Sequence, residues 1–90
     1  MGFIKVCNMM GQSGEVKNQF LITTKEGIFF QSYDSIIVFK DQNNNVFLDE
    51  YYYNYSSTTS KYRNQFLGKS TKEIEKLINE GIYKLVNLNK

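Results

Sequence analysis

The side chains best suited to chemistry or recognition are concentrated in one segment, Tyr51–Gly68, which reads YYYNYSSTTSKYRNQFLG. Five of the seven tyrosines of the chain lie between residues 51 and 62. Residues 51–72 carry four positive charges and no acid, although the net charge of the whole chain is only +2. Tyrosine and arginine are enriched among the residues that dominate binding energies. The segment therefore predicts a tyrosine-rich, basic recognition surface, with its four cations at Lys61, Arg63, Lys69 and Lys72.

The first tyrosines of this segment follow an apolar stretch that is typical of a β-strand. If the strand continues beyond Asp49, then Tyr51, Tyr53 and Tyr55 project to one face, because alternate residues of a strand do so. One interpretation is a half-buried edge strand, in which each ring is apolar at its base and solvated at its hydroxyl. The other interpretation is a binding surface for a partner. The sequence leaves both interpretations open.

A run of hydroxyl residues, Ser56–Ser60, marks the start of a helix. A hydroxyl at the N-cap of a helix accepts a backbone N–H that has no partner within the helix. We expect the helix over about Thr59–Leu67, with Tyr62 and Phe66 one turn apart on its apolar face. Gly68 then ends the helix in the left-handed conformation.

The start of this helix is also a candidate anion site. Capping accounts for one or two hydroxyls, and the others, with the free N–H groups of the first turn, suit a phosphate or carboxylate. On a helix that buries Tyr62, Lys61 and Arg63 point to solvent on either side of the apolar stripe. Capping is the simpler explanation, because the chain has no glycine-rich phosphate loop. The candidate binding residues of the segment are Tyr51, Tyr53, Tyr55, Ser57, Thr58, Thr59, Lys61, Arg63 and Lys69.

The residue types that are missing argue against catalysis and metal binding. The chain has no histidine and a single cysteine, Cys7, so no imidazole is present to activate that thiol. Asp49 and Glu50 are adjacent, so on a strand they point to opposite faces and do not form an acid–base pair. Neither zinc-finger nor calcium-loop spacing is present. We therefore expect a protein that is not an enzyme and that binds no metal or cofactor.

The bulk properties indicate one small domain over residues 1–90. Of these residues 41% are apolar, which is enough for a single core. No apolar run approaches the roughly 20 residues that a membrane helix needs, and the N-terminus lacks an apolar signal segment. With its lone cysteine, the chain is expected in the cytoplasm, without a membrane partner. Residues 1–15 are poorly defined by the sequence pattern. Within them we expect a short strand at Phe3–Val6 and a turn at Gly11–Gly14.

The hydrophobic pattern predicts an α+β domain. Four strands joined by short turns are expected over residues 16–49, as an antiparallel meander. Ser70–Glu73 (STKE) is a capping box at the start of a second helix. That helix has an apolar stripe from Ile74 onward and ends near Gly81, before a last strand at Ile82–Leu88. The expected order is ββββααβ: an antiparallel sheet of about four to five strands, with two short helices packed on one face.

Three motifs carry a resemblance to a family. They are FQSYDS at Phe30–Ser35, LDEYYY at Leu48–Tyr53 and STTSKYRNQFL at Ser57–Leu67. With them the chain resembles, over about residues 22–88, a group of small uncharacterised proteins from bacteriophages and mobile elements of Gram-positive bacteria. The N-terminal fifteen residues take no part in the resemblance. It implies an accessory protein that binds host machinery, including defence nucleases and nucleotide-signalling effectors, and it carries no catalytic residues over.

Three functions of different classes follow as expectations. The leading one is a non-enzymatic phage or mobile-element accessory protein, which inhibits or redirects a host factor in the host cytoplasm as an anti-defence inhibitor, through the tyrosine-rich basic surface. The second is a small nucleic-acid-binding protein that stacks bases on tyrosines and pairs phosphates with the four cations. The third is a nucleotide-sequestering protein that uses the helix start. An exposed tyrosine-rich edge strand would also pair with its own copy, so a homodimer is expected.

Overall fold

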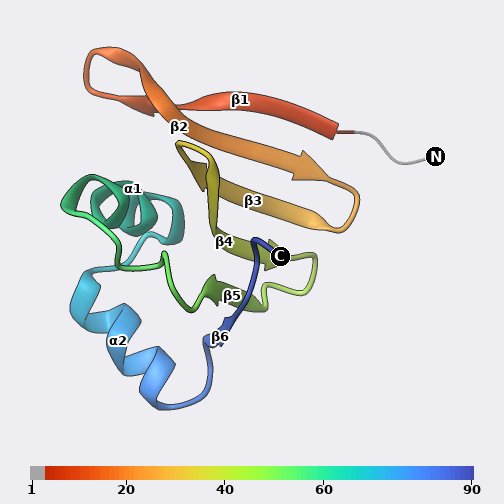
Figure 1. Ribbon diagram of the computed structural model, residues 1–90, viewed down its shortest axis with the longest axis vertical. Coiled ribbons are helices and arrows are strands. Elements are labelled where there is room, and N and C mark those ends of the chain that lie inside the picture. Colours follow the sequence, from red (N-terminus) through yellow and green to blue (C-terminus); the bar gives the residue numbers. More distant parts are fainter. Residues whose placement is uncertain (1–3) are drawn as a thin grey trace.

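The computed structural model describes residues 4–90, and its fold is α+β (Figure 1). A mixed sheet of six strands is combined with two helices, so the predicted class is confirmed and the sheet has more strands than predicted. None of the helices in residues 4–90 has the length and apolar character needed to cross a membrane. In chain order the elements are β1 (Ile4–Gly11), β2 (Gly14–Thr24), β3 (Gly27–Ser32), β4 (Ser35–Asp41), β5 (Val46–Asp49), α1 (Ser57–Leu67), α2 (Thr71–Asn79) and β6 (Lys84–Val86).

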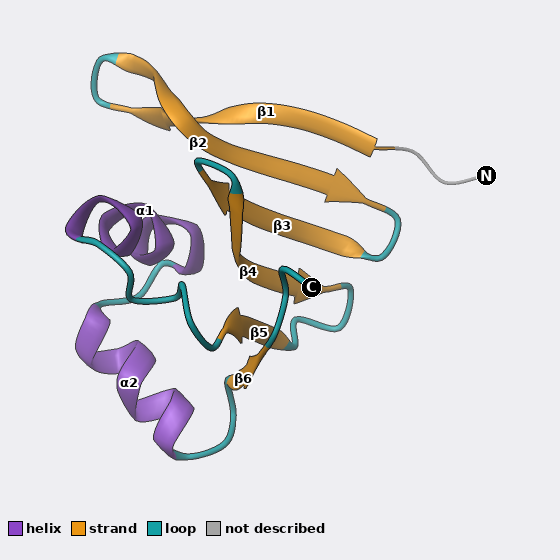
Figure 2. Cartoon of the chain, viewed as in Figure 1, coloured by secondary structure: helices purple, strands orange, loops and turns teal. Residues whose placement is uncertain are grey.

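The strands lie in the sheet in the order of the sequence, β1 to β6. Strands β1 to β5 form the antiparallel meander that the short turns predict. Strand β6 pairs parallel with β5, because the two helices between them return the chain to the end at which β5 began. In Figure 2 both helices lie on the same side of the twisted sheet, as expected from the sequence.

Strand β1 is the largest departure from the expected order. The short strand expected at Phe3–Val6 is present over its described residues and continues to Gly11, and Ile4–Asn8 pairs residue by residue with β2. Phe3 lies outside the described residues. The turn expected at Gly11–Gly14 is confirmed. The extension of the strand to Gly11 was not predicted, because Cys7–Gly11 shows no regular alternation of apolar and polar residues.

The core lies between the sheet and the helices. Phe30, Val38 and Leu48 are adjacent across three strands and are fully buried. Ile74 of α2 is buried against the same cluster, and the Phe66 ring of α1 stacks on the Phe30 ring with centroids 6.0 Å apart. Both helices therefore owe their positions to one apolar face of the sheet.

The opposite face of the sheet carries a second apolar row that neither helix covers. Residues directly opposite each other in paired strands project to the same face. By that register a row crosses five strands, with the Phe29 and Phe39 rings stacked at 4.4 Å and the Phe39 and Phe47 rings at 6.1 Å. The row consists of Val6, Ile22, Phe29, Phe39 and Phe47.

Helix α1 begins two residues before the predicted start. The Ser56 hydroxyl accepts the Thr59 N–H at 3.1 Å, which makes Ser56 the N-cap. Gly68 ends the helix with φ of 66°, as predicted. Tyr62 and Phe66 pack against the core, which confirms the predicted apolar face.

The capping box at the start of α2 is confirmed and supports a stability prediction. The Ser70 hydroxyl accepts the Glu73 N–H at 3.2 Å, and the Glu73 carboxylate accepts the Ser70 N–H at 2.9 Å. Replacing Ser70 with alanine removes one of these bonds, so we expect the free energy of unfolding to fall by about 0.5–2 kcal/mol in urea denaturation. The control is Ser13→Ala in the exposed β1–β2 turn, expected to stay within about 0.5 kcal/mol. Equal stability of both variants would contradict a role for the box.

Candidate functional site

Residues 51–55, within the connection between β5 and α1, form a tight turn that is called here the tyrosine loop. The Tyr53 N–H donates to the Asp49 carbonyl at 3.0 Å, and the Tyr55 N–H donates to the Tyr52 carbonyl at 3.2 Å. The prediction of an extended strand with Tyr51, Tyr53 and Tyr55 on one face is therefore wrong. The physical reason is Asp49, whose carboxylate accepts backbone N–H groups just beyond it and so bends the chain out of the sheet.

The turn gathers a different set of rings from the one that strand alternation predicts. The rings of Tyr51, Tyr52 and Tyr55 contact one another, with centroid separations of 4.7, 5.4 and 6.3 Å. Tyr51 is 71% exposed and Tyr55 is 64% exposed, whereas Tyr52 packs partly against the core. Tyr52 was missed because a strand would have pointed it to the opposite face. Rings three and four residues apart meet only when the chain turns.

The Tyr53 side chain does not belong to this ring cluster and instead faces α2. Its hydroxyl donates to the Glu75 carboxylate at 3.3 Å. Burial, and after it the negative charge of Glu75, raises the pKa of Tyr53 above its ordinary value. Tyr53 therefore anchors the loop to the helix and is not part of the exposed ring cluster.

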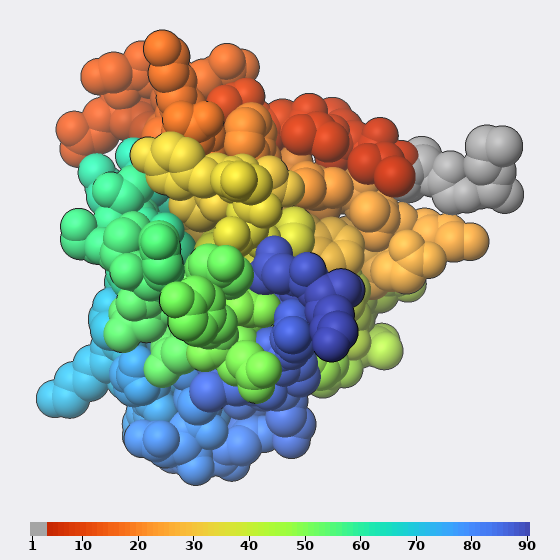
Figure 3. Space-filling view, in the orientation of Figure 1, coloured from red at the N-terminus to blue at the C-terminus, as the bar shows by residue number. Residues whose placement is uncertain are grey.

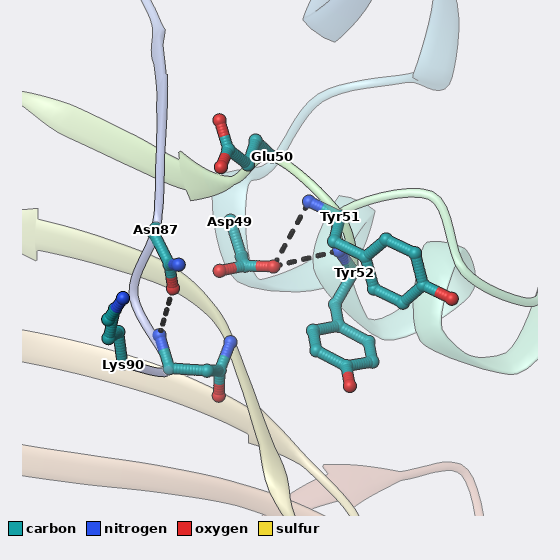
Figure 4. Close-up of a pocket in the computed structure, with 7 residues that line it drawn as sticks. Asp49, Glu50, Tyr51, Tyr52, Asn87 and Lys90 are labelled. Atoms are coloured by element: carbon teal, nitrogen blue, oxygen red, sulfur yellow. Dashed lines mark hydrogen bonds between the residues drawn. The ribbon is translucent and has the colours of Figure 1, made fainter.

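Asp49 is the first of two buried charged residues that hold the loop. It is 2% exposed, and its carboxylate accepts the N–H groups of Tyr51 at 3.1 Å and Tyr52 at 2.9 Å (Figure 4). Its other oxygen accepts the Leu88 N–H at 2.8 Å, which ties the C-terminal residues beyond β6 to the loop. Burial by itself raises the pKa of Asp49, but these hydrogen bonds and one from Asn89 outweigh it, so the pKa is lowered.

Arg63 is the second buried charge, and the expectation that it points to solvent is wrong. It is fully buried, and its guanidinium donates to the Tyr53 carbonyl at 2.7 Å. The other nitrogens donate to the Asn64 side-chain oxygen at 2.8 and 3.1 Å and to the Thr71 hydroxyl at 3.0 Å. The guanidinium also lies 5.9 Å from the centre of the Tyr53 ring. Burial lowers the pKa of Arg63 from its ordinary value. That ordinary value is so high that the side chain stays charged at neutral pH.

The hydroxyls at the start of α1 divide into exposed and buried ones. Ser57 and Thr58 are exposed in the first turn. Thr59 is only 2% exposed, and its hydroxyl is bonded to the Ser32 and Ser56 hydroxyls at 3.1 Å each. The candidate role of Thr59 as an anion ligand is therefore wrong, since its oxygen is already used to join the helix to the sheet.

The remaining cations lie apart from the exposed tyrosines. Lys61 is exposed, its ammonium lies 5.3 Å from the Tyr62 ring, and with Lys17 it lines a pocket of about 640 Å³ beside the Gly11–Gly14 turn. Lys69 is half-buried in the connection between the helices. Neither Lys61 nor Lys69 lines a pocket together with the exposed Tyr51 or Tyr55.

Two pockets flank the exposed rings, and Tyr52 lines both. One has a volume of about 430 Å³ and is lined by Tyr33 and Asp34 of the β3–β4 turn together with Tyr52 and Tyr55. The other, of about 350 Å³, is lined by Glu50 and Tyr51 and by the C-terminal residues (Figure 4). Figure 3 shows the loop as a raised patch between the β3–β4 turn and the C-terminus. We call this patch the tyrosine surface: Tyr33, Tyr51, Tyr52 and Tyr55, with Asp34 and Glu50 at its edges.

The charges around the tyrosine surface are mainly negative. Its pockets are lined by the carboxylates of Asp34, Asp49 and Glu50, and by a single cation, Lys90. Tyr33, which is 55% exposed, and Asp34 belong to the β3–β4 turn, and neither was among the predicted site residues. Within residues 4–90 no group of three or more histidine, cysteine, aspartate or glutamate side chains is placed to hold a metal. The arrangement therefore suits recognition by rings and carboxylates.

Comparison with known proteins identifies a family and no characterised relative. A search of curated proteins found no match. A search of solved structures found none either. A family model described as a family of unknown function, DUF8033, matches residues 4–81, which include β1 and all of the tyrosine loop. Because the match covers most of the chain, the protein belongs to the DUF8033 family.

Proposed function

We propose that the chain is a non-enzymatic cytoplasmic protein that binds a protein partner through the tyrosine surface. The observation that carries this proposal is the use of two fully buried charged residues to hold one exposed loop. Asp49 fixes the start of the loop through the N–H groups of Tyr51 and Tyr52. Arg63 fixes its middle through the carbonyl of Tyr53.

Such an arrangement is costly if the loop is only a connection. Moving a charge out of water costs several kcal/mol, and it is tolerated only when hydrogen bonds satisfy the buried group. Here both charged groups are satisfied mainly by the backbone and neutral side chains of the loop and its neighbours. The result is a set of large rings that are exposed and yet fixed in position. Fixed aromatic side chains lose little entropy on binding, which favours tight association.

The edges of the tyrosine surface favour a partner with basic residues. Carboxylates of Asp34 and Glu50 repel a phosphate backbone, so they argue against nucleic acid at the tyrosines. They attract lysine and arginine, whose charged groups also bind favourably over tyrosine rings. A nucleic acid or nucleotide would have to bind beside Lys17 and Lys61 instead, away from the loop.

The cellular role that we propose is that of a phage or mobile-element accessory protein, which inhibits or redirects a host factor. The resemblance in the motifs FQSYDS and LDEYYY supports this role, because both motifs contribute residues to the tyrosine surface: Tyr33 and Asp34 from the first, and Glu50, Tyr51 and Tyr52 from the second. The proposed activity is therefore occlusion of a basic site on the host factor.

The test is the double change Tyr51→Ser with Tyr55→Ser. Both rings are mostly exposed, so we expect little loss of stability, and a loss of partner affinity of at least about tenfold, as for hot-spot residues. Host proteins retained by the immobilised wild-type chain would be identified, and the dissociation constant of each measured by calorimetry for both forms.

The matched control is Ile82→Ser, because Ile82 is 59% exposed and lies outside the tyrosine surface. A partner that binds the wild type and the control, and binds the double variant at least about tenfold more weakly, supports the proposal. A partner that binds all three forms equally well places the binding site elsewhere. Binding that strengthens when the basic residues of the partner are removed would overturn the assignment of charge.

A further inference from the structure

The two edges of the sheet differ in how well they are protected. Edge strands carry unpaired N–H and C=O groups, and proteins shield them with short length, proline, charge or bulges. Strand β6, at one edge, has only three residues. Strand β1, at the other edge, has eight, and its segment Ile4–Asn8 pairs regularly with β2, with an irregularity only beyond Asn8. This segment contains no proline and one charged residue, Lys5.

The same segment exposes apolar side chains. Ile4 is 73% exposed and Val6 is 58% exposed. Both project to the face that the helices leave open, where Val6 is the end of the row that continues through Ile22 and Phe29. The row of apolar side chains therefore runs across the sheet and stops abruptly at its unprotected edge.

We propose that a second copy of the chain pairs with this edge, β1 against β1, antiparallel and related by a two-fold axis perpendicular to the sheet. This assembly is independent of the tyrosine surface, and it replaces the expected dimer through a tyrosine-rich edge strand, which does not exist. An axis of this kind keeps the same face upward in both copies, so the apolar rows of the two sheets meet end to end.

The sequence of the segment fixes the register. Val6 is the central residue of the regular segment Ile4–Asn8. A two-fold axis at this residue places Val6 opposite Val6 of the second copy. Lys5 then lies opposite Cys7 of the second copy. An axis one residue earlier would set Lys5 against its own copy, and like charges directly opposite each other are destabilising. Antiparallel self-pairing therefore favours Val6 at the axis.

The experiment is sedimentation equilibrium of the wild type, Val6→Lys and Ile82→Lys. Ile82, 59% exposed, matches Val6 in exposure but lies far from β1 in the chain. We expect the wild type and Ile82→Lys to dimerise with rising concentration and Val6→Lys to remain a monomer. A wild type that keeps a mass near 10.6 kDa at all concentrations up to about 1 mM overturns the proposal. Dimerisation that Ile82→Lys abolishes and Val6→Lys preserves also overturns it.

The register is tested by charge complementation. Val6→Lys and Val6→Glu each place like charges at the axis, so each is expected to be monomeric alone, and their mixture is expected to form a heterodimer. A mixture that stays monomeric while the wild type dimerises overturns the pairing at Val6. The variant Tyr51→Ser with Tyr55→Ser is expected to dimerise like the wild type, so failure of this proposal is distinguishable from failure of the tyrosine surface.

Discussion

Replacing Arg63 with alanine is expected to lower the free energy of unfolding by about 3–5 kcal/mol, a large part of the 5–15 kcal/mol typical of a domain. The guanidinium is fully buried and supplies donors to Tyr53, Asn64 and Thr71. Its removal takes these donors from the Tyr53 carbonyl and the Asn64 side-chain oxygen, leaves the Thr71 hydroxyl with only the Asn64 amide as a donor, and also leaves a cavity. Urea denaturation followed by circular dichroism measures the loss.

The control for this prediction is Lys61→Ala, two residues away on the same helix. Lys61 is exposed, so its variant is expected to stay within about 0.5 kcal/mol of the wild type. Arg63→Lys separates charge from geometry: an ammonium keeps the charge but does not span three acceptors in a plane, so most of the loss is expected to remain. An alanine variant as stable as the Lys61 control would show that the guanidinium does not hold the loop.

The burial of Arg63 explains why part of the site was not predictable from the sequence. Two of the groups that receive its hydrogen bonds lie ten residues before it and eight residues after it, on the tyrosine loop and at the start of α2. The surrounding sequence offers no acid as a partner, and in that absence arginine is typical of an exposed helix face. Its neutral acceptors become visible only when the loop and α2 are placed in space.

Features that depend on neighbours in sequence were predicted well. The capping box at Ser70 and the left-handed end of α1 at Gly68 are local, and both are confirmed. The apolar faces of the helices and the meander follow from periodicity, which is also local. The full length of strand β1 and the turn of the tyrosine loop were not predicted, for opposite reasons. The second half of β1 has no alternation of apolar and polar residues, and the tyrosine loop has a strand-like composition that the carboxylate of Asp49 overrides.

Asp49 and Arg63 together make the loop part of the rigid fold. Asp49 ties the loop to the C-terminal residues through the Leu88 N–H, and Arg63 ties the loop to both helices. A change at either position is therefore expected to weaken partner binding as well as stability, whereas changes at Tyr51 and Tyr55 weaken binding alone. This difference separates residues that position the surface from those that touch the partner.

Replacing Asp49 with asparagine is expected to lower the free energy of unfolding at neutral pH by about 1.5–3 kcal/mol, the usual value of hydrogen bonds to a charged group. The carboxylate accepts N–H groups from Tyr51, Tyr52 and Leu88, and an amide offers them one oxygen and a competing donor. Glu50→Gln is the control, because Glu50 is the exposed neighbour, and it is expected to stay within about 0.5 kcal/mol.

The role of the Asp49 charge is tested by the pH dependence of the difference in unfolding free energy between the wild type and Asp49→Asn. The pKa of Asp49 is lowered in the folded protein, so its contribution is complete above the unfolded pKa of about 3.9 and is lost as the pH falls through the lower folded pKa. The stability gap between the wild type and Asp49→Asn is therefore expected to be constant from pH 7 to about 5 and to narrow below about pH 4. The pKa values of Asp41 and Glu73 are also lowered, but both residues titrate in both proteins. Their contributions to the free energy of unfolding therefore largely cancel in the stability gap. A gap that stays constant into acid would mean that the shape of the side chain, and not its charge, holds the tyrosine loop.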